Sequence, residues 1–303
     1  MAHHASHRYA ALAIFAGMAV FAPANAGWFD SFDSSPASSV VSDQTVEEIQ
    51  RAVDDQRYLD AGRMLNDALM KSNDDPQLLV LGGQVSLYRG QYDDALKSFK
   101  QIDGNPAVRA RALEGEGLAL SLLGRSDEAV KALQAAVAAN PAAWRAWNAM
   151  GTEYDRRHDW QDADAAYEHA ISASGGNPLV LNNRGFSRLS QNRLDDATAD
   201  FVAALEKKPD FAPARNNLRL AIAMKGDYQR AVSGAGRSDR AAILNNAGFV
   251  AMLRGDYSAA KDLFGQAIKA KGEYYSLAAA NLEKTNGLAT EPDSQHGDAN
   301  AVH

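Results

Sequence analysis

Three pairs of adjacent asparagines are the most distinctive candidates for binding chemistry in this 303-residue chain. The pairs are Asn182-Asn183, Asn216-Asn217 and Asn245-Asn246, and they recur at nearly regular intervals. An asparagine amide carries both donors and an acceptor, so stacked asparagines can hold the peptide groups of an extended ligand. Asparagine is also a poor helix former, which gives three pairs a local cost within helices. Two interpretations stay open: the amides form a ladder for a peptide backbone, or they face solvent or satisfy backbone groups between helices.

The residues that most often perform catalysis are poorly arranged for it. His158 and His169 lack the H-E-x-x-H spacing, and His296 and His303 lie near the C-terminus. The run Gly115-Glu116-Gly117 lacks the third glycine and the preceding strand of a dinucleotide-binding loop. The chain has no cysteine, which excludes disulfides, thiolate catalysis and cysteine-ligated zinc. We therefore expect no enzymatic activity, no metal site and no cofactor.

The net charge also limits the classes of partner that the protein is expected to bind. The formal net charge is -7, from 31 basic and 38 acidic residues. An acidic chain lacks the basic surface that binds the phosphates of DNA or RNA, so we expect no nucleic-acid partner. Hydrophobic residues make up 46% and charged residues 23%, which is typical of a soluble globular protein.

Residues 1–26 have the pattern of a secretory signal peptide. Arg8 precedes an apolar run over Tyr9–Ala22, and Ala24 and Ala26 form an A-x-A cleavage site. The run is shorter than the roughly 20 residues that cross a bilayer, although an uncleaved anchor remains the alternative. We expect an exported protein whose mature form has no integral membrane segment.

Residues 27–41 are rich in serine and predict a flexible leader. Trp28, Phe29 and Phe32 are unusual in such a leader. They are either a short docking motif or residues without a role near the processing site.

A regular spacing of small and large residues runs through most of the chain. Alanines recur with a period of 34, shortened to 29 at the last step, at Ala61, Ala95, Ala129, Ala163, Ala197, Ala231 and Ala260. Glycines precede five of them by twelve positions, at Gly83, Gly117, Gly151, Gly185 and Gly248. Large apolar residues follow most of the alanines by four, at Leu65, Phe99, Leu133, Tyr167, Phe201 and Phe264. This register predicts two helices per repeat, because a small residue lets a neighbouring helix approach and the large residue fills the adjacent space.

A turn is expected between the glycine and the alanine of each repeat. Its first residue is Gly90, Gly124, His158, Asn192, Gly226 or Gly255. Glycine and asparagine tolerate the left-handed conformation that ends a helix. Acidic pairs such as Asp93-Asp94 then begin the second helix and complement its positive end.

These residues resemble the tetratricopeptide repeat. The signature W-x-x-M-G-x-x-Y is present at Trp147, Met150, Gly151 and Tyr154. The resemblance implies an all-α solenoid over residues 42–284, in which helix pairs stack into a right-handed superhelix with a concave groove. Seven units start near residues 42, 76, 110, 144, 178, 212 and 241.

The sixth unit and the C-terminal end of this array depart from the pattern. In the sixth unit Arg219 replaces the glycine, and Gly234 and Gly236 damage the second helix. Residues 274–284 predict a capping helix, and residues 285–303 a disordered tail.

The resemblance also implies where a partner would bind. The two asparagine positions of each pair would line the concave groove, and the second position, at Asn183, Asn217 and Asn246, would hold the ligand backbone. Phe186 and Phe249 lie one helical turn further on and would take apolar ligand groups. Replacing the three asparagines by alanine is expected to leave the fold intact and to remove partner binding.

A narrower resemblance is to the TadD family. It depends on N-N-x-G-x-S at Asn182–Ser187, on N-N-L at Asn216–Leu218, on the broken sixth repeat and on the Tyr-rich final helix. Members of that family take part in assembling Flp (tight adherence) pili and are outer-membrane lipoproteins thought to act as pilotins for the secretin. Their signal is followed by a lipobox cysteine, where this chain has Gly27.

The resemblance implies a non-enzymatic periplasmic scaffold of the Flp pilus and secretion apparatus. It would bind an extended segment of a secretin or another pilus component, and lie at the outer membrane only through that partner. The alternative is a periplasmic adaptor for envelope or cell-wall machinery unrelated to pili.

Overall fold

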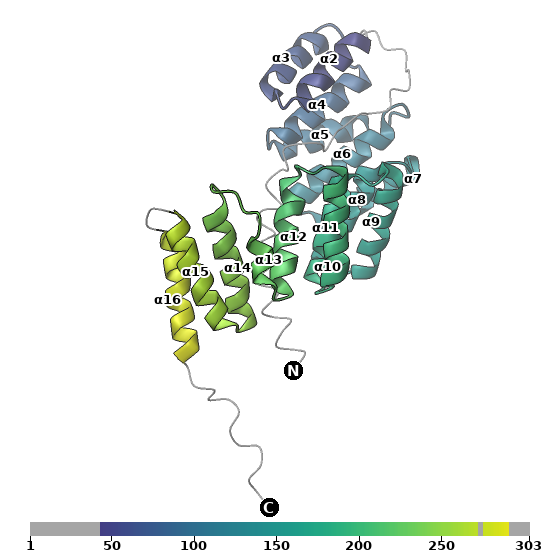
Figure 1. Ribbon diagram of the computed structural model, residues 1–303. Coiled ribbons are helices and arrows are strands. Elements are labelled where there is room, and N and C mark those ends of the chain that lie inside the picture. The colour runs from purple at the N-terminus through teal and green to yellow at the C-terminus, as the bar shows by residue number, and fades with distance from the viewer. Residues whose placement is uncertain (1–42, 272–274, 291–303) are drawn as a thin grey trace, which may run out of the picture. The chain divides into compact units, whose positions relative to one another are not determined.

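The computed structural model describes residues 43–271 and 275–290 (Figure 1). Within these ranges the chain forms fifteen helices and no strand. The expected signal peptide, the serine-rich leader and residues 291–303 lie outside the described residues. The all-α fold class is confirmed.

The helices alternate along the chain as first and second members of seven repeats, followed by a last helix. The first helices are α2 (Asp43–Asp54), α4 (Pro76–Tyr88), α6 (Arg109–Leu122), α8 (Trp144–Arg157), α10 (Pro178–Ser190), α12 (Ala212–Met224) and α14 (Arg240–Arg254). The second helices are α3 (Tyr58–Leu69), α5 (Tyr92–Ile102), α7 (Ser126–Ala139), α9 (Trp160–Ser174), α11 (Leu194–Lys207), α13 (Tyr228–Val232) and α15 (Tyr257–Lys271). The last helix is α16 (Ser276–Thr290).

The described residues divide into two compact units, and the boundary in the sequence falls within α10. The N-terminal unit comprises residues 43–187, and the C-terminal unit comprises the described residues from 188 onward. Each unit has its own buried apolar clusters.

Six of the seven repeats turn at the residue that the sequence predicted. Positive φ angles between 60° and 90° occur at the ends of the first helices, at Gln56, Gly90, Gly124, His158, Asn192, Gly226 and Gly255. Six of these were predicted from the sequence. Gln56 is the seventh, one repeat length before Gly90. It shows that the repeat geometry is kept even where the sequence of the first unit is degenerate.

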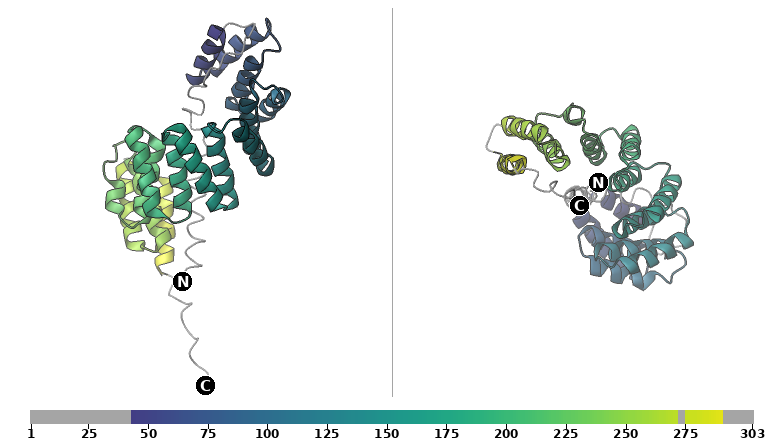
Figure 2. Two further views of the ribbon diagram at one scale, coloured as in Figure 1. Left: turned by 90° about the vertical axis from the view of Figure 1, so that its right-hand side faces the viewer. Right: turned by 90° about the horizontal axis from the view of Figure 1, so that it is seen from below.

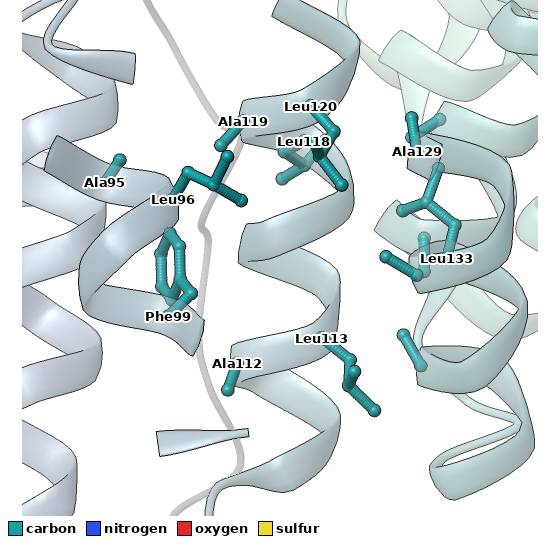
Figure 3. Close-up of a cluster of buried hydrophobic side chains, with 14 of the residues drawn as sticks. Ala95, Leu96, Phe99, Ala112, Leu113, Leu118, Ala119, Leu120, Ala129 and Leu133 are labelled. Atoms are coloured by element: carbon teal, nitrogen blue, oxygen red, sulfur yellow. The ribbon is translucent and has the colours of Figure 1, made fainter. Parts of the chain in front are cut away.

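Close packing of large residues against glycines holds the helices of the N-terminal unit together. A Cβ atom at Gly83 of α4 would lie 2.6 Å from the Phe99 ring, and one at Gly115 of α6 would meet the same ring. A Cβ at Gly117 would lie 2.5 Å from Leu133. Figure 3 shows Phe99 on α5 and Leu133 on α7 on opposite sides of α6. Only glycine at these positions allows the helices to approach so closely.

The same small-and-large register continues in the C-terminal unit. A Cβ at Gly248 of α14 would lie 2.9 Å from the Phe264 ring of α15. The helices α15 and α16, at the yellow end of the colour scale, lie side by side in both views of Figure 2. All seven signature alanines are at most 1% exposed, which fits their expected place between helices.

The sixth repeat is shortened as expected, and Arg219 explains how the shortening is tolerated. Its second helix, α13, has five residues. Arg219 stands where five of the other first helices have glycine. Its Nη1 donates hydrogen bonds to the backbone oxygens of Ala231 and Ser233, both at 2.7 Å. The guanidinium therefore satisfies carbonyl groups that are left without helical partners where α13 ends.

The capping helix is longer than the sequence predicted. It ends at Thr290 rather than near residue 284. Thr285 is fully buried and Leu288 packs against the apolar cluster of α14 and α15. Residues 285–290, expected to be disordered, therefore belong to the cap, because these side chains cover the last repeat.

Candidate protein-binding face

Buried polar side chains are concentrated on the first helices of the described repeats. They are Gln84, Glu114, Arg145, Asn148, Glu153, Asn182, Asn183, Ser187, Asn217 and Asn245. Among the described second helices, Asp200 of α11 is the buried polar residue, and it forms an ion pair with Arg188 at 2.8 Å. Buried polar side chains are therefore largely confined to the first helices in the described repeats.

In the N-terminal unit, asparagine amides connect successive first helices. Asn183 of α10 donates from Nδ2 to Oδ1 of Asn148 in α8, at 3.0 Å. Asn182 donates to Oδ1 of Asn183 at 3.4 Å. All three side chains are buried. Sequence reasoning missed Asn148, although it stands one repeat length before Asn182 and so shares its repeat position.

The C-terminal unit repeats this arrangement at its end. Asn281 of α16 donates from Nδ2 to Oδ1 of Asn245 in α14, at 3.0 Å. Asn217 of α12 is also buried. Asn216 and Asn246 are exposed, so they are the two members of the three predicted pairs that a ligand reaches without any rearrangement.

The structure therefore corrects one expectation drawn from the sequence. Asn183 and Asn217 are 8% and 7% exposed, so they do not lie on an open helix surface. Replacing Asn183 by alanine leaves the acceptor of buried Asn148 without this partner, and an unsatisfied buried polar group is destabilising. The triple alanine variant is thus unsuitable as a binding mutant that leaves stability unchanged.

A buried carboxyl group, Glu114, stands one repeat length before Asn148. Burial raises the pKa of Glu114 on α6 from 4.5 to about 6, and the charge of Arg145, a hydrogen bond from the backbone of Ala146 and the charge of Arg111 oppose that rise. The Arg145 guanidinium carbon lies 4.5 Å from the centre of the Trp144 ring. Glu114 of α6 and Arg145 of α8 therefore interact electrostatically between two successive first helices.

A second buried acid connects three helices of the N-terminal unit. Asp155 of α8 accepts a hydrogen bond from the Tyr167 hydroxyl at 2.8 Å and from the Ser187 hydroxyl at 2.5 Å. Burial raises the pKa of Asp155 to about 6 against the opposing effect of these two hydrogen bonds. The contacts join α8 to α9 and α10, so this acid has a structural role in the repeat.

For the remaining predicted site residues, the structure gives the burial but shows no contact with a ligand. Phe186 and Phe249 are half-buried on α10 and α14, and Gly185 is buried on α10. Phe186 belongs to the N-terminal unit and Phe249 to the C-terminal unit. Their expected part in a groove stays a prediction.

Other kinds of site find no support among the described residues. No cluster of three or more histidine, aspartate or glutamate side chains there could hold a metal ion. None of the helices in that part of the chain combines the length and the apolar character needed to cross a bilayer.

Comparison with known families decides the repeat type. The sequence profile of the tetratricopeptide repeat matches residues 80–143, 115–178 and 182–242, which together cover more than half of the chain. The chain belongs to the tetratricopeptide repeat family. Proteins of this family are generally non-enzymatic, and this protein is a tetratricopeptide repeat scaffold for protein–protein interaction.

Solved tetratricopeptide structures share the fold at low sequence identity. The Cut9 and Hcn1 complex of the APC/C has a TM-score of 0.63 at 15% identity, over 81% of this chain and 49% of that one. PilW, a type IV pilus biogenesis factor, has a TM-score of 0.55 at 17% identity, over 81% of this chain and all of PilW. TTC0263 of Thermus thermophilus has a TM-score of 0.55 at 21% identity, over 59% of this chain and 97% of that protein.

Similar sequences cover only part of the chain. Protein FlbA of Caulobacter vibrioides is 32% identical over 115 residues, which are 36% of this chain and 19% of FlbA. Human tetratricopeptide repeat protein 13 is 29% identical over 110 residues, or 13% of its own length. The chain thus spans less than a fifth of the length of these curated relatives.

Proposed function

We propose that the protein binds an extended segment of a partner protein along the face formed by its first helices. The observation that carries this proposal is that Asn216 and Asn246 are exposed on first helices, each next in sequence to a buried asparagine. A peptide brings unpaired N–H and C=O groups, and only a polar face can satisfy them when the peptide is bound. Among the described second helices, Asp200 of α11 is the buried polar residue, so this chemistry is largely confined to the first helices.

The asparagines divide between two roles in this proposal. The buried amides of Asn148 and Asn183 connect the first helices α8 and α10, and buried Asn245 connects α14 to the last helix α16. The exposed amides of Asn216 and Asn246 remain available to the ligand. Because each amide offers a donor and an acceptor, these two side chains suit a peptide backbone independently of its sequence.

For the setting, we propose a periplasmic assembly factor of the Flp pilus and its secretion apparatus. Support comes from the signal-peptide pattern of residues 1–26 and from the N-N-x-G-x-S and N-N-L segments of α10 and α12. PilW is a protein of this fold that acts in pilus biogenesis, but a similarity at 17% identity supports the fold alone. A general envelope adaptor is the alternative, and it uses the same face.

The test is a pull-down from detergent-solubilised envelope, with the exported protein as bait. The binding variant replaces Asn216 and Asn246 by alanine. The matched control replaces Gln229 and Gln266, two exposed amides on the second helices of the same repeats. Enrichment of a secretin or pilus protein that is lost in the asparagine variant and kept in the glutamine variant is the expected result.

Other outcomes separate the parts of the proposal. Capture of cell-wall or division proteins with the same dependence on Asn216 and Asn246 would keep the binding face and replace the pilus setting. Equal capture by both variants would contradict the binding face itself. Normal surface piliation in a deletion strain would overturn the pilus assignment.

A further inference from the structure

A pocket of about 360 Å³ opens in the N-terminal unit between α3 and α4. Its apolar lining includes Leu59, Leu69 and Leu79, and its polar lining includes Arg63 and Arg89. Leu59 is 74% exposed. A volume of this size accommodates a large aromatic side chain, which makes the pocket a candidate binding site.

The pocket exists because two helix-interior glycines leave space there. Gly62 of α3 and Gly82 of α4 both line it. One repeat later, the corresponding residues are Leu96 and Glu116. A Cβ at Gly82 would have its nearest neighbour, Leu65, at 3.5 Å, and one at Gly62 would have Arg89 at 3.9 Å.

These two glycines differ in kind from the signature glycines. Their neighbours lie at ordinary contact distances, so the packing of the repeat does not demand glycine at either position. Glycine within a helix costs about 1 kcal/mol relative to alanine. The sequence therefore keeps an open space at a cost to helix stability, which is the pattern expected where another group enters.

The charge around the pocket indicates the kind of group. Arg89 is exposed and its guanidinium extends over Gly62, and it makes no ion pair within the described part of the chain. Arg63 pairs with Asp60 at the rim. An apolar cavity beside an uncompensated cation suits a segment that carries aromatic residues next to carboxylates.

The chain itself contains such a segment. The sequence Trp28-Phe29-Asp30-Ser31-Phe32-Asp33 alternates aromatic and acidic residues, and lies outside the described residues. Residues 34–42 separate Asp33 from the start of α2, and at roughly 3.3–3.6 Å per residue this stretch spans up to about 35 Å. The helix α2 packs directly on α3 and α4, so the pocket lies within that reach.

We propose that the segment Trp28–Asp33 docks into the pocket between α3 and α4 of its own molecule. An aromatic side chain fills the space over Gly62 and Gly82, and Asp30 or Asp33 pairs with Arg89. Tethering places the segment at an effective concentration in the millimolar range, so even a weak site is occupied. The docked segment covers the apolar surface that the first repeats expose.

The test uses the absence of native cysteine, which makes every introduced thiol unique. Ser31→Cys is combined with Asn66→Cys at the pocket, and in a control with Lys131→Cys on α7, an exposed position of the same unit. A short bismaleimide should cross-link the first pair within one molecule in several-fold higher yield than the control pair.

Two variants show whether the pocket chemistry is responsible. Replacing Trp28, Phe29 and Phe32 by serine changes no described residue, and should reduce the cross-link to the level of the control. Gly82→Met should do the same by filling the pocket, with its melting curve confirming that the unit stays folded. Equal yields for both cysteine pairs, or a yield unaffected by the serine variant, would overturn the proposal. A cross-link that joins two molecules and grows with protein concentration would overturn its intramolecular form.

Discussion

Replacing Gly83 by alanine should destabilise the N-terminal unit, although alanine is the better helix former. The new Cβ would lie 2.6 Å from the Phe99 ring, whereas carbon atoms in ordinary contact are about 3.5–4.0 Å apart. Phe99 is fully buried, and Gly115 of the next repeat lies against the same ring. The ring therefore has no free space into which it can move.

The expected magnitude follows from two opposing effects. Overpacking of a core typically costs about 1–3 kcal/mol, and an overlap near 1 Å against a confined ring favours the upper part of that range. The gain in helix propensity from glycine to alanine is about 1 kcal/mol. We expect a net loss of about 1–2 kcal/mol in the free energy of unfolding.

The assay is urea unfolding followed by circular dichroism, with hydrogen exchange in α4 to α6 to locate the effect. The control is Gly265→Ala in α15, where an added Cβ meets no atom within 4 Å and should stabilise the protein by about 1 kcal/mol. Combining Gly83→Ala with Phe99→Leu should recover part of the loss. If Gly83→Ala stabilised the protein as Gly265→Ala does, the assigned packing of Phe99 would be wrong.

The polar groups lead to three further predictions. Burial raises the pKa of Glu114 from 4.5 to about 6, so the folded state favours the protonated form and its stability should fall as pH rises through that window. At about 1.4 kcal/mol per pKa unit, the full decrease in the free energy of unfolding is about 2 kcal/mol. Urea unfolding at pH 5 and at pH 7.5 should show a smaller decrease for Glu114→Gln than for the parent chain. Asn183→Ala should lower the free energy of unfolding by about 1–3 kcal/mol, whereas Asn216→Ala should leave it nearly unchanged. A double-mutant cycle of Asn183→Ala with Asn148→Ala should give a non-zero coupling energy. Arg219→Ala should accelerate hydrogen exchange in α13 because its terminal carbonyls lose their donor, and unchanged exchange would contradict that capping contact.

Much of the fold was predictable because the same residue types recur at the same positions of each repeat. The left-handed turn residues and the small residues between helices recur at fixed intervals, so each repeat supports the interpretation of the others. Even the shortened sixth repeat was visible in its glycines. The role of Arg219 was not, because its hydrogen bonds reach residues 12 and 14 positions further along.

The candidate site was less predictable, because burial depends on contacts between repeats. The Asn183 amide is buried through a partner in the preceding repeat, and no periodicity within α10 reveals that contact. The raised pKa of Asp155 arises in the same way, from packing of α9 and α10 around α8. The extension of α16 to Thr290 escaped notice because buried Thr285 stands among polar residues.

The central claim is that the partner contacts the first helices, and site-specific photo-cross-linking in living cells tests it most directly. A benzophenone amino acid would replace Asn216 or Asn246, and in parallel Gln229 or Gln266 on the second helices of the same repeats. The account predicts a partner adduct from the first two positions and none from the other two. Adducts from Gln229 and Gln266 alone would place the partner on the second helices and contradict the account.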